Sequence, residues 1–432
     1  MEDRQATAVH VHDAPTAMLS GVRVLDLTNT VGTFCGKVLA DLGADVLKIE
    51  PVGGSDERTM PPFATRADGR QESLWWRSFN RRKRGVTLDV RSPSGLELLG
   101  RLAEGSQVLI QSAYSAADLP LDPARVAELR AAQPRLVCTT ITPYGWDGPR
   151  AAYRARDITL QGMGTYMYVT GDGDRPPVRI GGDIAYCHAG SQAAAATVLA
   201  LYGTRRSGRG QVVDVSAQEA IVWTLLNTTM AWDVAGVEET RGGGVMRKER
   251  ASDLYTRLVW PCRDGWVHFV PIGGGGGFAR RSSFAKFVEW MHEEGVHDPV
   301  LGARDWNGKD ANDISQAEYD RVAAVILEFL GGKTQSELFE RALRDGVLLA
   351  PIEGMADVLR NPQLAARGFW DAGGDADFPD AVFPGPFARC SGTPLLRGGR
   401  SPELGEHNPE VYEKELGIAP STLERLASAG VV

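Results

Sequence analysis

Two short apolar runs near the start of the chain decide the fold: Arg23-Val-Leu-Asp-Leu27 and Asp45-Val-Leu-Lys-Ile-Glu50. Each run predicts a short buried strand. A turn that contains Gly32 follows the first run, and residues 35–42 then predict a helix that stops at Gly43. A strand, a helix and a second strand within about 28 residues make a βαβ unit close to the minimum length for such a crossover.

Strands and helices continue to alternate downstream. The sequence predicts strands at Gly85–Asp89, Gln107–Gln111 and Leu136–Ile141, with helices over 94–103 and 126–132 between them. A long alanine-rich helix over 190–202, a strand at Gln211–Val215 and an apolar helix over 218–235 follow. This alternation predicts an α/β fold with a Rossmann-like, mostly parallel sheet that carries helices on both faces.

The second half of the chain has a different pattern. A glycine cluster at Gly242–Gly244 precedes a predicted hairpin at Trp260–Ile272, whose turn is Asp264-Gly265. A second glycine run, Gly273–Gly277, leads into helices predicted over 283–294, 318–330 and 336–346. We therefore expect a smaller α+β domain inserted into the larger one.

The composition of the chain argues against several classes of protein. The chain has 432 residues, a net charge of −8 and a pI near 5.5, which argues against a general nucleic-acid binder. No apolar run is long enough for a membrane span, and the polar N-terminus lacks the apolar core of a signal peptide. Five scattered cysteines and no metal-ligand spacing among the histidines predict reduced thiols, a cytoplasmic location and no metal site.

Nucleotide-binding and serine-hydrolase motifs are missing. The turn after Leu27 reads TNTVGTFCGK, which matches neither GxGxxG nor a P-loop, although its place before a helix N-terminus still suits a phosphate. No Gly-x-Ser-x-Gly elbow is present. The basic run Arg81–Arg84 is either a solvated face or a partner for an anionic ligand.

Asp157 follows two arginines, Arg154 and Arg156, and opens an apolar helical run. The commoner role for an aspartate in this position is a helix N-cap. The alternative role is a nucleophile: an aspartate, with a reference pKa of about 3.9, is ionised at neutral pH and needs no base to attack a thioester carbonyl. The residues alone leave both roles open.

Several blocks stand in a fixed order along the chain: Leu19–Leu27, Leu39–Pro51, Ser78–Asp89, Tyr144–Pro149, Gly208-Arg-Gly-Gln211 and Leu404-Gly-Glu-His-Asn408. Together these blocks resemble one known family, the class III CoA-transferases, also called the formyl-CoA transferase or CaiB/BaiF family. The resemblance extends over residues 19–432. It implies an enzyme that moves CoA from an acyl-CoA thioester to a carboxylic acid, with CoA as a substrate and no tightly bound cofactor.

The resemblance also assigns roles to residues. It places the family's catalytic aspartate on Asp157, which would form an acyl anhydride and then an aspartyl-CoA thioester. It places the family's glycine loop on Gly242, Gly243 and Gly244, with Gly273–Gly277 as a rival. CoA contacts correspond to the five residues Thr30, Val31, Gly32, Arg91 and Tyr144.

Two departures from the family pattern concern substrate choice. The segment Gln111-Ser-Ala-Tyr-Ser115 replaces the family's Asn-Phe-Arg-Pro-Gly, so CoA contacts are altered there. Val31 stands where formyl-CoA transferases have a catalytic glutamine, which argues against formyl-CoA–oxalate chemistry. α-Methylacyl-CoA racemases share the fold but need a histidine upstream of the aspartate, and none lies between His12 and His188. A racemase-like enzyme and a non-catalytic CoA-binding subunit of a heteromeric transferase remain the alternatives.

The resemblance completes the expected organisation. We expect a flexible tail at 1–18, the first part of the large CoA-binding domain at 19–205 and linker helices at 206–240. A small domain at 241–335 and a C-terminal return at 336–432 that completes the large domain follow. Family members form interlocked dimers, so we expect an interlocked homodimer as well.

Overall fold

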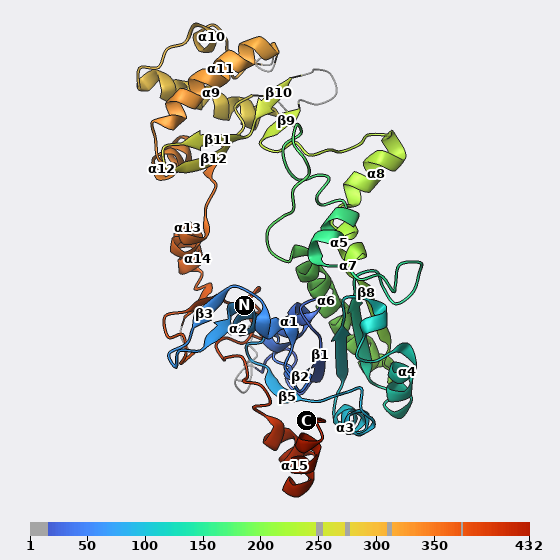
Figure 1. Cartoon of the computed structure of the whole chain (residues 1–432). Coiled ribbons are helices and arrows are strands. Elements are labelled where there is room, and N and C mark those ends of the chain that lie inside the picture. The colour runs from blue at the N-terminus through green and yellow to red at the C-terminus, as the bar shows by residue number, and fades with distance from the viewer. Residues whose placement is uncertain (1–15, 248–253, 273–276, 309–312, 373–374) are drawn as a thin grey trace, which may run out of the picture. The chain divides into compact units, whose positions relative to one another are not determined.

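The computed structural model describes residues 16–247, 254–272, 277–308, 313–372 and 375–432. The chain divides into two compact units (Figure 1). Unit 1 comprises the chain up to Tyr166, Ile180–Met230 and Ala366–Val432. Unit 2 comprises Met167–Arg179 and Ala231–Ala365.

A six-stranded sheet forms the centre of unit 1. Its strands are β1 (Arg23–Leu27), β2 (Asp45–Glu50), β5 (Arg84–Thr87), β6 (Val108–Ser112), β7 (Val137–Thr142) and β8 (Val212–Ser216). They lie in the order β5-β2-β1-β6-β7-β8, and every neighbouring pair is parallel. The predicted α/β fold with a parallel sheet is confirmed.

Helices cover both faces of this sheet because its strands are apolar on both sides. One core packs Val24, Val46 and Val108 against α1 (Thr33–Asp41) and α6 (Ile184–Ser207). The small residues of α6 allow close packing: an added Cβ at Gly190 would lie 2.8 Å from Cβ of Phe34. The opposite core packs other strand residues against α3 (Pro93–Glu104), α4 (Pro123–Ala132) and the C-terminal residues Val411 and Tyr412.

Short elements complete unit 1. They are the 3₁₀ turns η1 (Asp56–Thr59) and η2 (Ala116–Asp118), the hairpins β3 (Phe63–Thr65) with β4 (Gln71–Ser73) and β14 (Trp370–Ala372) with β15 (Val382–Pro384), and the helices α2 (Leu74–Phe79), α5 (Asp157–Met163) and α7 (Ala217–Trp223). The chain ends in a π-helical turn, η4 (Pro409–Glu415), and α15 (Pro420–Ser428). Two helices straddle the unit boundaries, α8 (Leu226–Ala235) and α14 (Pro362–Ala366).

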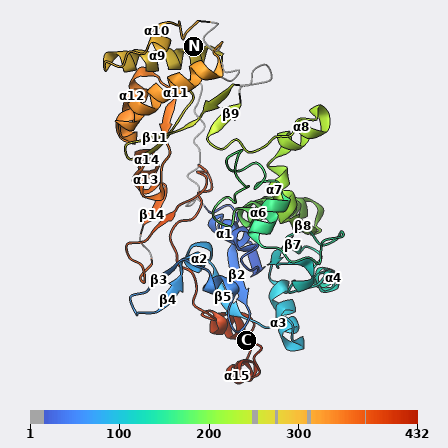
Figure 2. The same ribbon diagram turned by 45° about the horizontal axis from the view of Figure 1, so that its top comes forward.

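Unit 2 has its own apolar core. Its strands are β9 (Val245–Arg247), β10 (Tyr255–Arg257), β11 (Val259–Cys262), β12 (Gly265–Phe269) and β13 (Leu349–Pro351), and its helices are α9 (Gly277–Glu293), α10 (Pro299–Gly302), α11 (Gln316–Gly331), α12 (Gln335–Asp345) and α13 (Met355–Arg360). Trp260, Phe269, Phe287 and Trp290 are buried together there. The strands form two small sheets, β10-β9 and β11-β12-β13, and Figure 2 shows α9, α11 and α12 in the same part of the unit as β11.

The boundaries differ from the sequence-based expectation in three places. The segment 206–240 was expected as linker helices, but its predicted strand, β8, joins the main sheet beside β7, and the segment belongs to unit 1 as far as Met230. The return to unit 1 comes at Ala366 rather than residue 336, because Leu338 and Ala342 of α12 pack into the core of unit 2. The helix predicted over 218–235 is broken into α7 and α8 at Thr224, whose hydroxyl donates to the Ile221 carbonyl.

The predicted hairpin near Trp260 is confirmed, with its turn shifted by one residue. Cys262 pairs with Gly265, so Arg263 and Asp264 form the two-residue loop. No helix among the described residues combines the length and apolarity that a membrane crossing requires.

Candidate active site

A cavity of about 540 Å³ opens at the carboxyl ends of the strands of unit 1. Leu27 after β1, Ile49 of β2 and Ser112 of β6 line it. The sheet changes direction here, because β2 and β5 lie on one side of β1 while β6 and β7 lie on the other. Open parallel sheets bind ligands at this kind of switch point, so the cavity is the leading candidate for a ligand site.

Arg91 is the basic residue that lines the cavity. It follows β5, is exposed, and its main-chain N–H donates to the Asp89 carboxylate at 3.1 Å. Asp118 also lines the cavity and forms an ion pair with Arg154 at 3.2 Å. The guanidinium of Arg91 therefore lies on the cavity wall itself. The guanidinium of Arg154 lies next to the wall, because it pairs with Asp118.

Tyr114 connects the cavity to the segment that carries Asp157. Its hydroxyl donates to the Asp56 carboxylate at 2.5 Å, and its carbonyl accepts the N–H of Ala155 at 3.1 Å. The guanidinium of Arg156 lies 3.9 Å from the centre of the Tyr114 ring. Burial, followed by the bond to Asp56, raises the pKa of Tyr114 to about 12. The phenol is therefore neutral and holds the Asp157 segment beside the cavity wall.

Asp157 is the first residue of α5, and Arg156 is its N-cap. The N-cap role considered for Asp157 is therefore wrong, because Arg156 holds that position; the Asp157 carboxylate instead bonds Gln161 within α5 and Ala185 of α6. Oδ1 accepts the main-chain N–H of Ala185 at 2.8 Å, and Oδ2 accepts Nε2 of Gln161 at 2.7 Å. Only 3% of the residue is exposed. Ala185 lies in the first turn of α6, so the positive end of a 24-residue helix stabilises the carboxylate.

Four of the five expected CoA contacts lie outside the cavity lining. Thr30, Val31 and Gly32 are buried, and Val31 packs into the core against α1 and α6. Thr30 donates from its hydroxyl to Asp56 at 3.3 Å. Tyr144 is half-buried and donates to the Met163 sulfur at 3.0 Å. Of the five residues expected to contact CoA, only Arg91 lines the cavity. Contact between CoA and the other four stays a prediction.

The glycine turn at 242–244 belongs to unit 2. Gly243 has a φ of +56°, and an added Cβ there would lie 2.2 Å from Oδ1 of Asp172. The Val245 N–H closes the turn on the Gly242 carbonyl at 3.0 Å. These glycines thus have a packing reason within unit 2, and their role as an active-site loop stays a prediction. The rival run lies outside the described residues for positions 273–276.

A buried ion network lies directly behind the cavity wall. Lys48 Nζ lies 2.6 Å from the Glu57 carboxylate, and Lys83 Nζ lies 2.8 Å from Asp26. All four side chains have no exposed surface. Lys48 also donates to the carbonyl of Thr28, a cavity residue, at 2.5 Å. The network therefore fixes the position of the turn after β1.

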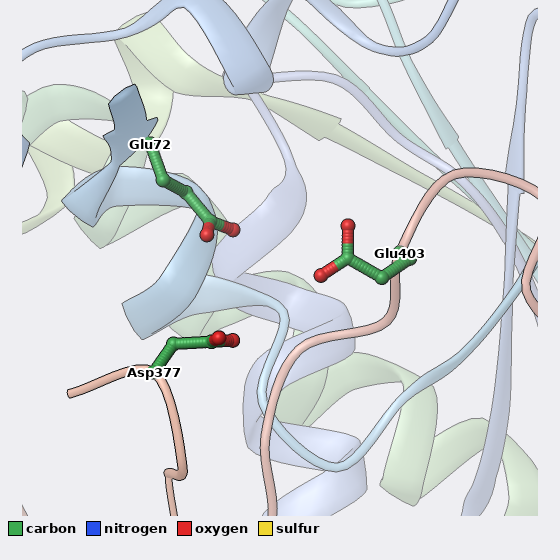
Figure 3. A group of neighbouring side chains, drawn as sticks. All are labelled: Glu72, Asp377 and Glu403. Atoms are coloured by element: carbon green, nitrogen blue, oxygen red, sulfur yellow. The ribbon is translucent and has the colours of Figure 1, made fainter. Parts of the chain in front are cut away.

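Three carboxylates, Glu72, Asp377 and Glu403, converge in unit 1 (Figure 3). Arg66 pairs with all three at 3.2, 3.0 and 2.6 Å, and Arg77 bonds Glu72 at 2.7 Å. The guanidinium groups supply the positive charge that a metal ion would otherwise supply. This cluster ties the C-terminal segment to the β3–β4 hairpin and has the character of a structural ion-pair network.

Sequence reasoning missed Gln161 and Tyr114. Both act through contacts with residues distant in the chain, such as Ile180 and Asp56. Tyr114 had a partial signal, since it stands in the segment that departs from the family pattern. Gln161 follows Asp157 by one helical turn, which places it on the same helix face and was the available signal.

Comparisons with known proteins agree on one family. A family model described as CoA-transferase family III matches residues 19–408. The succinyl-CoA:(R)-benzylsuccinate CoA-transferase subunit BbsE of Thauera aromatica is 31% identical, over 96% of this chain and 98% of its own length. The succinate–glutarate CoA-transferase of Agrobacterium fabrum is 30% identical, over 95% and 97%. A solved CaiB/BaiF family protein from Brucella suis has 28% identity and a TM-score of 0.76, and the match covers 93% of this chain and all of that one.

Proposed function

Because the chain belongs to CoA-transferase family III, we propose that it transfers CoA from an acyl-CoA thioester to a free carboxylate with Asp157 as the covalent nucleophile. Two observations support the proposal. The Asp157 carboxylate is held by two N–H donors, and its segment is tied through Tyr114 to the cavity at the switch point of the sheet. The second observation supports the proposal most strongly, because the segment that carries Asp157 bonds a residue of the cavity wall.

The chemistry proceeds in four balanced steps. Asp157 attacks the thioester carbonyl, which forms an acyl–aspartyl anhydride and releases CoA thiolate. The thiolate attacks Cγ of Asp157, which forms the aspartyl-CoA thioester and releases the donor acid as a carboxylate. The acceptor carboxylate attacks the same Cγ and expels the thiolate again. The thiolate finally attacks the acceptor's acyl carbon, which yields the new thioester and restores Asp157.

Burial of Asp157 has a chemical advantage in this scheme. An anhydride hydrolyses readily, and a residue that is 3% exposed meets little water. The same donors that bind the carboxylate can bind its oxygen when Cγ becomes tetrahedral and negative, because Ala185 N–H and Gln161 Nε2 already lie within hydrogen-bond distance.

The decisive experiment traps the covalent enzyme. The purified chain is incubated with a panel of acyl-CoAs, quenched with hydroxylamine and digested, and the peptide containing residue 157 is weighed. We expect modification at Asp157 with the productive donor, and loss of that modification together with at least 10³-fold loss of turnover in Asp157→Asn. Asp147→Asn, an exposed carboxylate in unit 1, is the matched control. A fully active Asp157→Asn enzyme would disprove the role.

The relatives' names suggest which substrates to test first. Both named enzymes act on four- or five-carbon dicarboxylates or a substituted succinate. We therefore propose succinyl-CoA as the first donor and a dicarboxylate such as glutarate as the first acceptor. A panel of monocarboxylate acceptors under the same conditions distinguishes a dicarboxylate preference from general transferase activity.

One observation favours an alternative, a subunit of a heteromeric transferase, because the Thauera relative is named as a subunit. Full transfer activity of the purified single chain would eliminate it. The racemase alternative predicts deuterium exchange at the α-carbon without exchange of CoA, and the same incubation in D₂O tests it. We also propose an interlocked homodimer in the cytoplasm, the latter in keeping with five free cysteines.

A further inference from the structure

Gln161 is a buried side chain whose amide bonds both the main chain and the Asp157 carboxylate. It has no exposed surface. Its Oε1 accepts the N–H of Ile180 at 2.8 Å, and its Nε2 donates to the carbonyl of the same residue at 3.1 Å. Nε2 carries a second hydrogen, which it donates to Oδ2 of Asp157 at 2.7 Å. The amide is therefore fixed on the main chain before it meets the carboxylate.

Ile180 is the residue at which the chain returns to unit 1 after the segment Met167–Arg179. The paired bonds from Gln161 fix both the donor and the acceptor of that residue. A glutamine held at both ends of its amide cannot rotate away, so the direction of its remaining N–H is set by the backbone. The orientation of the Asp157 carboxylate is thus tied to the backbone at Ile180.

The two oxygens of Asp157 meet different donors. Oδ1 accepts a main-chain N–H at the N-terminus of α6, where the helix supplies about half a unit of positive charge. Oδ2 accepts a neutral side-chain amide. Negative charge builds on one oxygen when Cγ is attacked, and the helix N-terminus stabilises that charge best at Oδ1. Oδ2 is then the oxygen that bonds to the acyl group.

We propose that Gln161 is the positioning residue of this site: its amide, fixed on Ile180, aims the attacking oxygen of Asp157 at the thioester. The proposal rests on the function proposed above, because it concerns the same nucleophile. Without the amide, Oδ2 of Asp157 loses this fixed donor, and the carboxylate gains freedom to turn about its Cβ–Cγ bond. A nucleophile misplaced by about 1 Å costs up to about 100-fold in rate.

Single-turnover kinetics test this. Enzyme in excess is mixed with acyl-CoA, quenched over time, and the covalent adduct on the intact protein is measured by mass. In Gln161→Met we expect the rate constant for adduct formation to fall about 10- to 100-fold, while the amplitude and the half-saturating acyl-CoA concentration stay near those of the wild type. A purely structural role predicts the reverse: a smaller amplitude, because fewer molecules are folded, and an unchanged rate constant.

Gln111 provides a matched control. It is also fully buried, its amide bonds both the N–H and the carbonyl of Leu121 at 3.0 Å, and its remaining donor meets the Thr140 hydroxyl at 3.2 Å. It does not line the cavity. Gln111→Met therefore removes the same bonds without touching a carboxylate, and we expect lower thermal stability with the wild-type rate constant.

Gln161→Glu keeps the acceptor for Ile180 and the length of the side chain, so it serves if Gln161→Met does not fold. It replaces the donor with an oxygen facing Oδ2, and the rate constant should fall at least as far. Adduct formation at the wild-type rate in either folded variant overturns the proposal. Absence of any adduct in the wild type is a separate outcome, since it removes the proposed function itself.

Discussion

At the residue scale, Asp56 links the cavity wall to the segment that carries Asp157. It accepts hydroxyl donors from Thr30 at 3.3 Å and Tyr114 at 2.5 Å. These bonds spread the charge of a carboxylate that would otherwise face an anionic ligand. The Tyr114 ring, in turn, lies under the guanidinium of Arg156, one residue before Asp157. Tyr114 thus has two separable functions, one through its hydroxyl and one through its ring.

Replacing Tyr114 tests the two functions separately. Tyr114→Phe keeps the ring and removes the bond to Asp56, so we expect KM for acyl-CoA to rise about threefold to tenfold with little change in kcat. Tyr114→Leu also removes the contact with Arg156, which is worth about 0.5–2 kcal/mol, and we expect kcat to fall as well. Steady-state kinetics of both variants provide the measurement. Equal effects of Phe and Leu on kcat would contradict a role for the ring.

Arg91 gives a prediction about CoA itself. It is the exposed guanidinium on the cavity lining, and CoA carries several phosphate charges. Arg91→Ala should raise KM for acyl-CoA about tenfold and leave kcat near the wild-type value, with a smaller difference at high salt because screening weakens the lost contact. Arg125→Ala on α4, where Arg125 pairs with Glu128, is the control. An unchanged KM in Arg91→Ala would place CoA elsewhere.

These residues also show what the sequence could and could not predict. The sequence singles out Asp157 and Arg91 as candidates because each follows a block that resembles the family. It does not identify Ala185 and Gln161, the residues that donate to the Asp157 carboxylate. One lies 28 positions away and the other looks like any polar residue on a short helix. Hydrogen bonds across the fold leave no periodicity in the sequence, so only the structure could supply them.

At the scale of elements, the buried ion network joins β1, β2, η1 and the turn before β5. Burial alone would raise the pKa of Asp26 and of Glu57, but Lys48 and Lys83 pull both below their ordinary values. The pairing therefore stabilises the fold at pH values above the unfolded pKa values of 3.8 and 4.5. As the pH falls through the lower folded values, both carboxylates take up protons and that stability is lost.

Lys48→Met tests the network. It removes the ammonium group that lies 2.6 Å from Glu57 and 3.8 Å from Asp26, and it leaves two buried carboxylates with one fewer cation. Breaking a buried pair in this way costs about 3–5 kcal/mol. Chemical denaturation at pH 7 should show that loss, and the loss should shrink toward pH 3 as the carboxylates become neutral. Arg125→Met is the exposed control, with an expected change within about 0.5 kcal/mol.

The sequence predicted whether a segment is a helix or a strand better than it predicted where one element ends and the next begins. The strand β2 was predicted from Asp45–Glu50, although Lys48 and Glu50 within it are fully buried ions. The apolar residues Val46, Leu47 and Ile49 were enough to predict a strand despite these two charged residues. The break between α7 and α8 was not predicted, because the run over 218–235 is mainly apolar and contains no proline or glycine. The hydroxyl of Thr224 donates to the carbonyl of Ile221 at the break, and helix propensity takes no account of such a hydrogen bond.

At the scale of the whole molecule, the chain returns to unit 1 twice, at Ile180 and Ala366. The sequence predicted one insertion, after residue 240, because the composition changes there. The short excursion over Met167–Arg179 was not predicted, since this stretch is rich in glycine, proline and charged residues and resembles an ordinary loop. Its return point is the residue that Gln161 holds, so the path of the chain and the orientation of Asp157 are coupled.

Unit 1 exposes a group of large apolar side chains that a single copy does not cover. They lie on α6, α7 and α8: Leu199, Tyr202, Trp223, Leu226 and Met230, each between 57% and 70% exposed. α8 has no buried residue among its ten. Large apolar side chains with this much exposure are the kind that interfaces cover, and burying one such side chain is worth about 1.5–3 kcal/mol. A second copy of this chain is the occupant that the proposed homodimer requires.

Trp223→Arg should therefore shift the protein from dimer to monomer. A guanidinium in an apolar interface loses its water without gaining a partner, so several kcal/mol of association energy disappear and the dissociation constant rises at least 100-fold. Light scattering on a gel-filtration column at micromolar concentration measures the mass directly. The control is Glu128→Arg, at an equally exposed site on α4, and this variant should still have the mass of a dimer. A wild-type chain that elutes with the 46.6 kDa mass of one copy would refute the homodimer, and these side chains would then face a different partner.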